Sequence, residues 1–116
     1  MKLRLTVVYE VDGHEIWLER IFENLEPPAY LRVGDSIELS YSDNAASFNV
    51  LAFDWYMPEN EIAIHLNPCV KPKDHDEFWH AVRAFLADNW EVCEGNTAYT
   101  TLNALRKKGY ADKITR

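Results

Sequence analysis

The first segment of the chain constrains the fold most, because its side chains alternate between apolar and polar with a period of two. In residues 2–11, KLRLTVVYEV, the odd positions from Leu3 to Val11 are apolar and most of the even ones are polar. This alternation is typical of a β-strand with one buried face. Asp12 and Gly13 follow, a pair that favours a two-residue turn. The sequence therefore predicts a hairpin with the next segment, HEIWLERIFE.

The same pattern indicates which residues of the two strands face each other. The register that keeps the apolar side chains on one face makes these cross-strand pairs: Val11 with His14, Tyr9 with Ile16, Val7 with Leu18, and Leu3 with Phe22. It also places Glu10 opposite Glu15, a like-charge pair that is slightly destabilising. A shift by one residue would turn the apolar set towards solvent, so we expect this register.

A second hairpin is expected in residues 48–66, FNVLAFDWYMPENEIAIHL, with its turn at Pro58 and Glu59. Its register joins apolar residues in these pairs: Trp55 with Ile62, Phe53 with Ile64, and Leu51 with Leu66. Trp55 is therefore expected in the core. The residues expected on the opposite face of the strands are Asp54, Tyr56, Glu61 and His65.

The segment between these hairpins is expected to hold one short strand. Pro27 and Pro28 indicate a loop, because proline cannot donate to a strand ladder. Residues 33–35, Val-Gly-Asp, then turn the chain into SIELSY, residues 36–41, in which apolar side chains occupy alternate positions. Residues 42–47, SDNAAS, are expected to form another loop.

After Pro72 the apolar period changes to that of a helix. The apolar side chains at positions i, i+4, i+7 and i+8 are Phe78, Val82, Phe85 and Leu86. This stripe predicts a helix over about residues 75–88. Asp74 precedes the helix and Glu77 follows three residues later, which is the spacing of a capping box.

The remaining sequence completes the predicted fold. WEVC, residues 90–93, is expected to be a short extended piece, and a second helix is expected to begin at Gly95 and end before Gly109. These elements predict one α+β domain over residues 1–116. We expect a mostly antiparallel five-stranded sheet or partly open barrel, followed by two C-terminal helices.

The acidic, histidine-containing stretch at the start of the first helix also raises the question of a metal site. His75 and His80 are five residues apart, about 140° around a helix of ~3.6 residues per turn, so they cannot bind one ion from a regular helix. Asp76 and His80 are four residues apart, but two ligands do not make a site. Helix capping accounts for the stretch better, and we expect neither a metal nor another cofactor.

The cysteines give little support to an enzyme. Cys69 and Cys93 belong to no C-x-x-C pattern and predict no disulfide framework. Cys69 lies close to Lys71, but no residue pattern supplies a catalytic base for it. A small metal- or cysteine-dependent enzyme that uses His75, His80 and Cys69 is therefore the alternative hypothesis, not the leading one.

The net charge of −7 is unevenly distributed along the chain. Residues 1–68 contain twelve acidic residues against four Lys or Arg, whereas residues 69–116 contain seven against eight. The first part is thus an acidic β-region and the second a nearly neutral helical region. An acidic surface repels nucleic acid and anionic membranes and attracts basic proteins.

The C-terminal tail holds the only basic cluster in the sequence, made of Arg106, Lys107, Lys108, Lys113 and Arg116. Five cations on a protein of net charge −7 are a weak electrostatic footprint for nucleic acid. At the other end, Glu10 and Asp12 interrupt any apolar run, so we expect neither a signal peptide nor a membrane span. A soluble protein of the reducing cytoplasm is expected.

The leading hypothesis is a small, acidic, non-enzymatic binding protein of the inhibitor or immunity type, such as a phage anti-defence protein. Its expected partner is the basic surface of a nucleic-acid-handling protein, not nucleic acid or a membrane. The residues expected to bind at the second hairpin are Asp54, Tyr56, Glu59 and Glu61. Trp17 and Glu19 form the alternative patch, where the carboxylate would pair with Lys or Arg and the aromatic ring would be the anchor.

Overall fold

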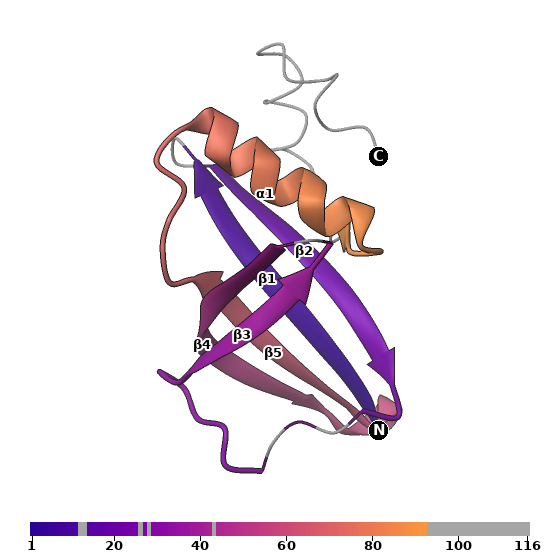
Figure 1. Ribbon diagram of the computed structural model, residues 1–116. Coiled ribbons are helices and arrows are strands. Elements are labelled where there is room, and N and C mark those ends of the chain that lie inside the picture. Colours follow the sequence, from indigo (N-terminus) through magenta and orange to yellow (C-terminus); the bar gives the residue numbers. More distant parts are fainter. Residues whose placement is uncertain (12–13, 26, 28, 43, 93–116) are drawn as a thin grey trace.

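The computed structural model describes residues 1–11, 14–25, 27, 29–42 and 44–92 (Figure 1). In this part of the chain one six-stranded sheet packs against one α-helix. The elements are β1 (Lys2–Val11), β2 (His14–Glu23), β3 (Ser36–Tyr41), β4 (Asn44–Tyr56), the one-turn 3-10 helix η1 (Met57–Glu59), β5 (Glu61–Pro68), α1 (His75–Ala87) and β6 (Glu91–Val92). The predicted α+β class is confirmed.

The sheet is mixed, with the strand order β3-β4-β5-β1-β2-β6. Most strand pairs are antiparallel, as predicted, but the sheet differs from the prediction in two details. β5 returns along β1 and pairs with it in parallel, and β6 adds a sixth strand at the edge of β2. The first strand of the chain is therefore central, between β5 and β2. The second predicted helix falls on residues 95–109, which lie outside the described residues.

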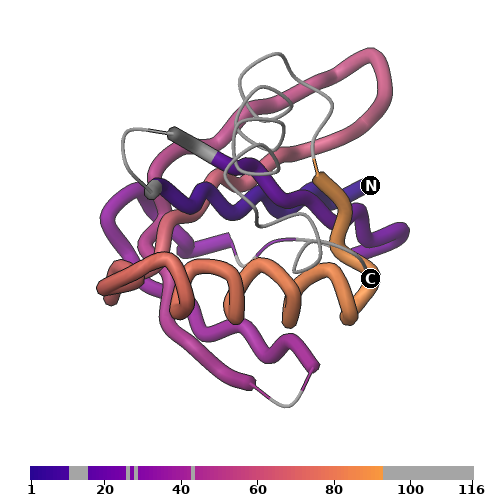
Figure 2. Tube along the Cα trace, turned by 90° about the horizontal axis from the view of Figure 1, so that it is seen from above, coloured from indigo at the N-terminus to yellow at the C-terminus, as the bar shows by residue number. Residues whose placement is uncertain are grey.

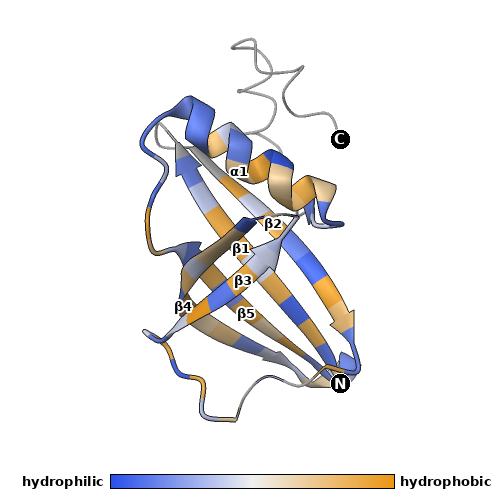
Figure 3. Cartoon of the chain, viewed as in Figure 1, coloured by the Kyte–Doolittle hydropathy of each residue, from blue (hydrophilic) through white to orange (hydrophobic). Residues whose placement is uncertain are grey.

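The predicted register of the β1–β2 hairpin is confirmed over its whole length. Val11 pairs with His14, and Glu10 pairs with Glu15 despite their like charges. Leu3 pairs with Phe22 at the other end of the hairpin. Apolar and polar residues alternate along these strands, as Figure 3 shows, so the apolar face is buried and the polar face points away from the core. The turn residues, 12 and 13, lie outside the described residues.

The β4–β5 hairpin matches the prediction only near its turn. Trp55 pairs with Ile62, and Phe53 pairs with Ile64, as expected. A bulge between Val50 and Ala52 then shifts the register, so Leu66 pairs with Val50 and not with Leu51. The extra residue of a bulge has no partner, and Leu51 is exposed.

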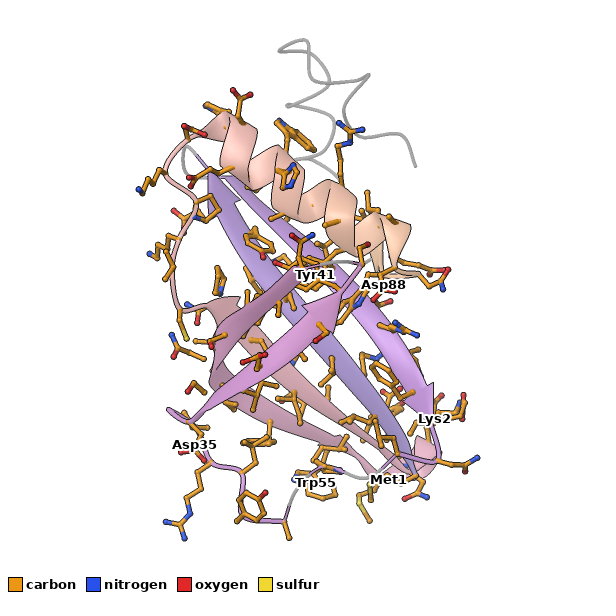
Figure 4. The ribbon with its side chains drawn as sticks, in the orientation of Figure 1. Met1, Lys2, Asp35, Tyr41, Trp55 and Asp88 are labelled. Atoms are coloured by element: carbon orange, nitrogen blue, oxygen red, sulfur yellow. The ribbon has the colours of Figure 1, made fainter. Side chains whose placement is uncertain are left out.

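Trp55 was predicted to be a core residue, but it is 61% exposed to solvent. β4 has 13 residues, and its last ones extend to the end of the sheet opposite α1, where no helix of the described residues covers them (Figure 1). The turn that follows is η1, and Asn60 closes it in the left-handed conformation with φ of 51°. Figure 4 shows Trp55 and Met1 at this end of the sheet, with Tyr41 close to α1.

The loop predicted for residues 42–47 is also wrong, because β4 begins at Asn44 and pairs at once with Tyr41. Ser42 has a φ of 54°, which allows a tight turn at this point. After the turn, alternate residues of β4 face the core: Ala46 is half-buried and Phe48 is buried. This is the pattern of a strand and not of a loop. The polar composition that suggested a loop belongs to the turn and to the solvent side of the strand.

α1 lies in the concavity of the curled sheet, with β1 and β2 on one side and the β3–β4 hairpin on the other (Figure 2). The apolar stripe is confirmed, since Phe78, Val82, Phe85 and Leu86 are buried together with Trp79. Phe85 stacks on Tyr41 of β3 with 3.9 Å between the ring centroids, and Phe78 meets Tyr9 of β1 edge to face. The helix of the described residues is neither long nor apolar enough to cross a membrane.

The start of α1 is capped as predicted, with one difference. The Asp74 carboxylate accepts a hydrogen bond from the backbone N–H of Glu77 at 2.9 Å. The Glu77 carboxylate accepts from the backbone N–H of Lys73 at 2.7 Å, one residue before the position found in a capping box. After the helix, Trp90 is buried, and the expected extended piece is β6, which pairs with Leu18 and Glu19 of β2.

Candidate partner-binding face

The polar side of the central strands gathers residues that are far apart in the sequence. We call this side the outer face and define it by Arg4 and Thr6 of β1, Trp17 and Glu19 of β2, Asp54 of β4, and Glu61 and His65 of β5. Side chains alternate along each strand, so these residues point away from α1 and the core. Because β1 lies between β5 and β2, the second-hairpin residues and the Trp17 patch are neighbours on one surface.

Arg4 connects these two groups of residues. Its Nη1 donates to Oε2 of Glu19 at 2.7 Å, and its Nη2 donates to Oε1 of Glu61 at 3.1 Å. Burial on its own would lower the pKa of Arg4, but the hydrogen bonds and charges of Glu61 and Glu19 raise it above its ordinary value. The guanidinium therefore remains charged and fixes both carboxylates.

His65 is held at the centre of the outer face by two hydrogen bonds. Its Nε2 lies 2.5 Å from Oδ2 of Asp54, and its Nδ1 lies 2.6 Å from Oγ1 of Thr6. A carboxylate accepts hydrogen bonds, so Nε2 donates to Asp54. In the tautomer that carries its proton on Nε2, Nδ1 accepts from the Thr6 hydroxyl. The Trp17 and His65 rings meet in a T-shaped arrangement with 6.0 Å between their centroids.

Asp, His and Thr are also the residue types of a hydroxyl-nucleophile triad. Here Thr6 is only 3% exposed, so a substrate has almost no access to its hydroxyl. The hydrogen bonds themselves are those of a triad, with the carboxylate on one ring nitrogen and the hydroxyl on the other, so it is the burial of Thr6 that argues against a nucleophile. The arrangement therefore fixes the positions of Asp54 and Trp17 and does not prepare a nucleophile.

The predicted binding residues differ in how far a partner can reach them. Asp54, Tyr56 and Glu59 are exposed, whereas Trp17 and Glu19 are half-buried. Glu61, which was expected to bind a partner together with Glu59, is the least accessible of these residues. Its side chain is 9% exposed because it lies under the guanidinium of Arg4. Its contribution to an interface remains a prediction.

The residues of the alternative hypothesis are elsewhere in the fold. His75 and His80 lie on α1, and Cys69 follows β5, where its thiol donates to Oδ1 of Asn49 at 3.2 Å. Among the residues that the structure describes, no three His, Cys, Asp or Glu side chains converge as metal ligands would. The alternative therefore gains no geometric support.

Sequence reasoning missed the roles of Arg4, Thr6 and His65. The strand patterns placed Arg4 and Thr6 on the polar side of β1 and His65 on the polar side of β5. What was missing was the parallel pairing of β1 with β5, which sets Thr6 beside His65. No local signal marks this long-range pairing.

Comparison with known proteins gives no relative: no protein-family model, no curated protein and no solved structure matches this chain.

Proposed function

We propose that this chain is a small, non-enzymatic binding protein that docks through its outer face onto a basic protein surface. An inhibitor or immunity-type protein would act in this way, including a phage protein that blocks a nucleic-acid-handling partner. The observation that carries the proposal is the clustering of carboxylates around Trp17 on one side of the sheet. In the described part of the chain, α1 packs on the other side.

The charge of this side favours a cationic partner. The described side chains on this side of the four central strands include five carboxylates against two cations, namely Glu10, Glu19, Glu23, Asp54 and Glu61 against Lys2 and Arg4. Glu38 of β3 and Glu91 of β6 add two more carboxylates at the edges of this side. Arg4 already neutralises the two inner carboxylates, Glu19 and Glu61. The charges left for a partner are therefore the exposed ones at the edge of the face, of which Asp54 is the most central.

An interface needs a desolvated anchor as well as charge. Trp17 is suited to this role, because its indole packs against the ring of His65 in a T-shaped contact. Aromatic side chains held in place by neighbours lose little entropy on binding and are common at the centre of interfaces. The surrounding carboxylates would pair with Lys or Arg of the partner and orient it.

Quantitative affinity capture tests this proposal. The Asp54→Lys/Glu59→Lys variant reverses an exposed charge on the outer face and one in the turn beside it. The control variant Asp35→Lys/Asp76→Lys makes the same net change at exposed positions in the loop before β3 and on α1. We expect wild type and the control variant to capture the same basic protein, and the first variant to lose it, with circular dichroism confirming that all three are folded. Equal capture by all three proteins would exclude the outer face as the interface.

A further inference from the structure

β3 (Ser36–Tyr41) forms one edge of the sheet, because in the described part of the chain it pairs only with β4. Figure 2 shows the β3–β4 hairpin at the margin of the molecule. Alternate residues of a strand direct their backbone N–H and C=O groups to one neighbour and then to the other, so half of these groups in β3 point to the free edge. β6, at the other edge, has only two residues, and the chain beyond Val92 lies outside the described residues.

The edge of β3 lacks the features that usually prevent further strand pairing, which are lysine, proline and bulges. β3 contains no lysine or proline, and it pairs with β4 in one continuous register. Glu38 is its only charged residue. On the core side, Ile37 and Leu39 are half-buried, and Tyr41 beside them is buried. β3 can therefore offer both backbone groups and a row of apolar side chains to another strand.

The side chains of β3 favour a second copy of β3 as that strand. In an antiparallel pair, residues that face each other point to the same side of the sheet, so two identical strands pair about an axis through one residue. The two registers with the greatest overlap have this axis at Glu38 or at Leu39. An axis at Glu38 brings two carboxylates face to face, which is destabilising. An axis at Leu39 joins apolar residues to apolar residues and each carboxylate to a hydroxyl, in these pairs: Leu39 with Leu39, Ile37 with Tyr41, and Glu38 with Ser40.

We propose that this protein forms a two-fold symmetric dimer through antiparallel pairing of β3 with β3 of a second copy, centred on Leu39. The two six-stranded sheets then form one continuous sheet. The two-fold axis of such a pair is perpendicular to the sheet, so the outer faces of both copies lie on the same side. A dimer of this kind could engage two sites of one partner at once, a consequence that rests on the proposed function, whereas the dimer itself does not.

Sedimentation equilibrium of the full-length protein tests this pairing. Ser40→Lys places an ammonium group opposite each Glu38 carboxylate, twice by symmetry, so we expect it to lower the dissociation constant of the dimer about fivefold. Ser40→Glu places carboxylates opposite each other and should raise the constant about fivefold. Ser36→Lys is the matched control, because Ser36 is an equally exposed serine two residues from Glu38 in the chain, but it faces Ser42 in the dimer. It makes the same change of net charge and should alter the dissociation constant much less than Ser40→Lys.

Disulfide trapping tests the register independently. In a protein that carries Cys69→Ser and Cys93→Ser, Leu39→Cys brings the two new thiols together at the two-fold axis, whereas Ile37→Cys faces Tyr41. We expect mild oxidation to yield a covalent dimer of the Leu39→Cys protein and little of the Ile37→Cys protein. Both positions are half-buried on the same side of β3, so the two variants are matched in burial. Circular dichroism checks that each variant is folded.

Three results would overturn the inference. The first is a wild-type protein that stays monomeric up to millimolar concentrations. The second is a dimer whose dissociation constant is the same in Ser40→Lys, Ser40→Glu and Ser36→Lys, since its interface would then lie elsewhere. The third is a covalent dimer that forms at least as readily through Ile37→Cys as through Leu39→Cys. Neither experiment involves the basic partner, so their failure would leave the proposed outer-face interface standing, and a failed affinity capture would leave the dimer standing.

Discussion

Arg4 and Glu61 are held together across the parallel pairing of β1 with β5, with 3.1 Å between the guanidinium and the carboxylate. The same guanidinium contacts Glu19 of β2 on the other side. One arginine thus joins strands from both predicted hairpins and sets the arrangement of the outer face.

Removing the charge of Glu61 should destabilise the fold. We expect Glu61→Gln to lower the free energy of unfolding by about 1–2 kcal/mol, less than for a fully buried pair, because Arg4 is partly exposed and keeps Glu19. Urea denaturation measures this change. Glu59→Gln, at an exposed position two residues earlier, is the control and should change stability by less than about 0.5 kcal/mol. Equal effects of the two substitutions would contradict a structural role for the ion pair.

The cap of α1 should contribute to stability and not to binding. Asp74→Ala should lower the free energy of unfolding by about 0.5–2 kcal/mol, because the backbone N–H of Glu77 loses its acceptor. Asp74→Asn retains an acceptor oxygen and should stay close to wild type in the same denaturation experiment. A folded Asp74→Ala protein that no longer captured the partner would argue against this assignment.

Tyr9 should make the fold sensitive to alkaline pH. Burial, together with the charge and hydrogen bond of Tyr41, raises the pKa of Tyr9 above its ordinary value of 10.0. The folded state therefore favours the neutral phenol of Tyr9. Its full contribution to the free energy of unfolding is present below pH 10, where the phenol is neutral in the unfolded chain too. Above pH 10 the free energy of unfolding should fall by up to about 1.4 kcal/mol per pH unit.

Urea denaturation between neutral pH and pH 11 checks this expectation for Tyr9 (about one unit above the ordinary pKa). Tyr9→Phe should lose part of the alkaline fall in stability, whereas Tyr30→Phe, at a highly exposed position, should retain all of it. If Tyr9→Phe followed the wild-type curve, the phenol of Tyr9 would not be the group responsible.

The tryptophans should divide into structural and surface residues. Trp79 is buried on α1, and Trp79→Ala should lower the free energy of unfolding by about 3–5 kcal/mol. Trp55 is largely exposed, and Trp55→Ala should lower the free energy of unfolding by less than about 1 kcal/mol. Thermal unfolding of the two variants distinguishes these effects, and a Trp55→Ala protein as unstable as Trp79→Ala would place Trp55 in the core after all.

The parts of the fold that could be predicted are those decided by neighbours in sequence. The β1–β2 register follows from alternation over ten residues, and the start of α1 follows from Asp74 and the apolar stripe. The bulge at Leu51 could not be predicted, since an apolar residue fits the alternating pattern equally well with or without it. Trp55 was misplaced because alternation reports the side of a strand and not whether another layer covers it.

The candidate site shows the same limit. Side-chain direction put Glu19 and Glu61 on polar strand faces, but their contact with one arginine depends on β5 joining β1 in parallel. That pairing is settled by tertiary packing, and the segments concerned are about 60 residues apart in the chain. Glu61 is buried by Arg4 across this pairing, so its burial could not be predicted from the sequence pattern.

The most direct test of the acidic docking face is the rate at which the captured partner associates, measured at increasing salt concentration. Salt screens exposed charges beyond ~8 Å at physiological ionic strength, so the wild-type association rate should fall steeply while dissociation changes little. Asp54→Lys/Glu59→Lys should associate more slowly and depend less on salt, whereas Asp35→Lys/Asp76→Lys, with the same net charge, should stay much closer to wild type. Association that is insensitive to salt, or equally fast for wild type and Asp54→Lys/Glu59→Lys, would contradict docking through the outer face.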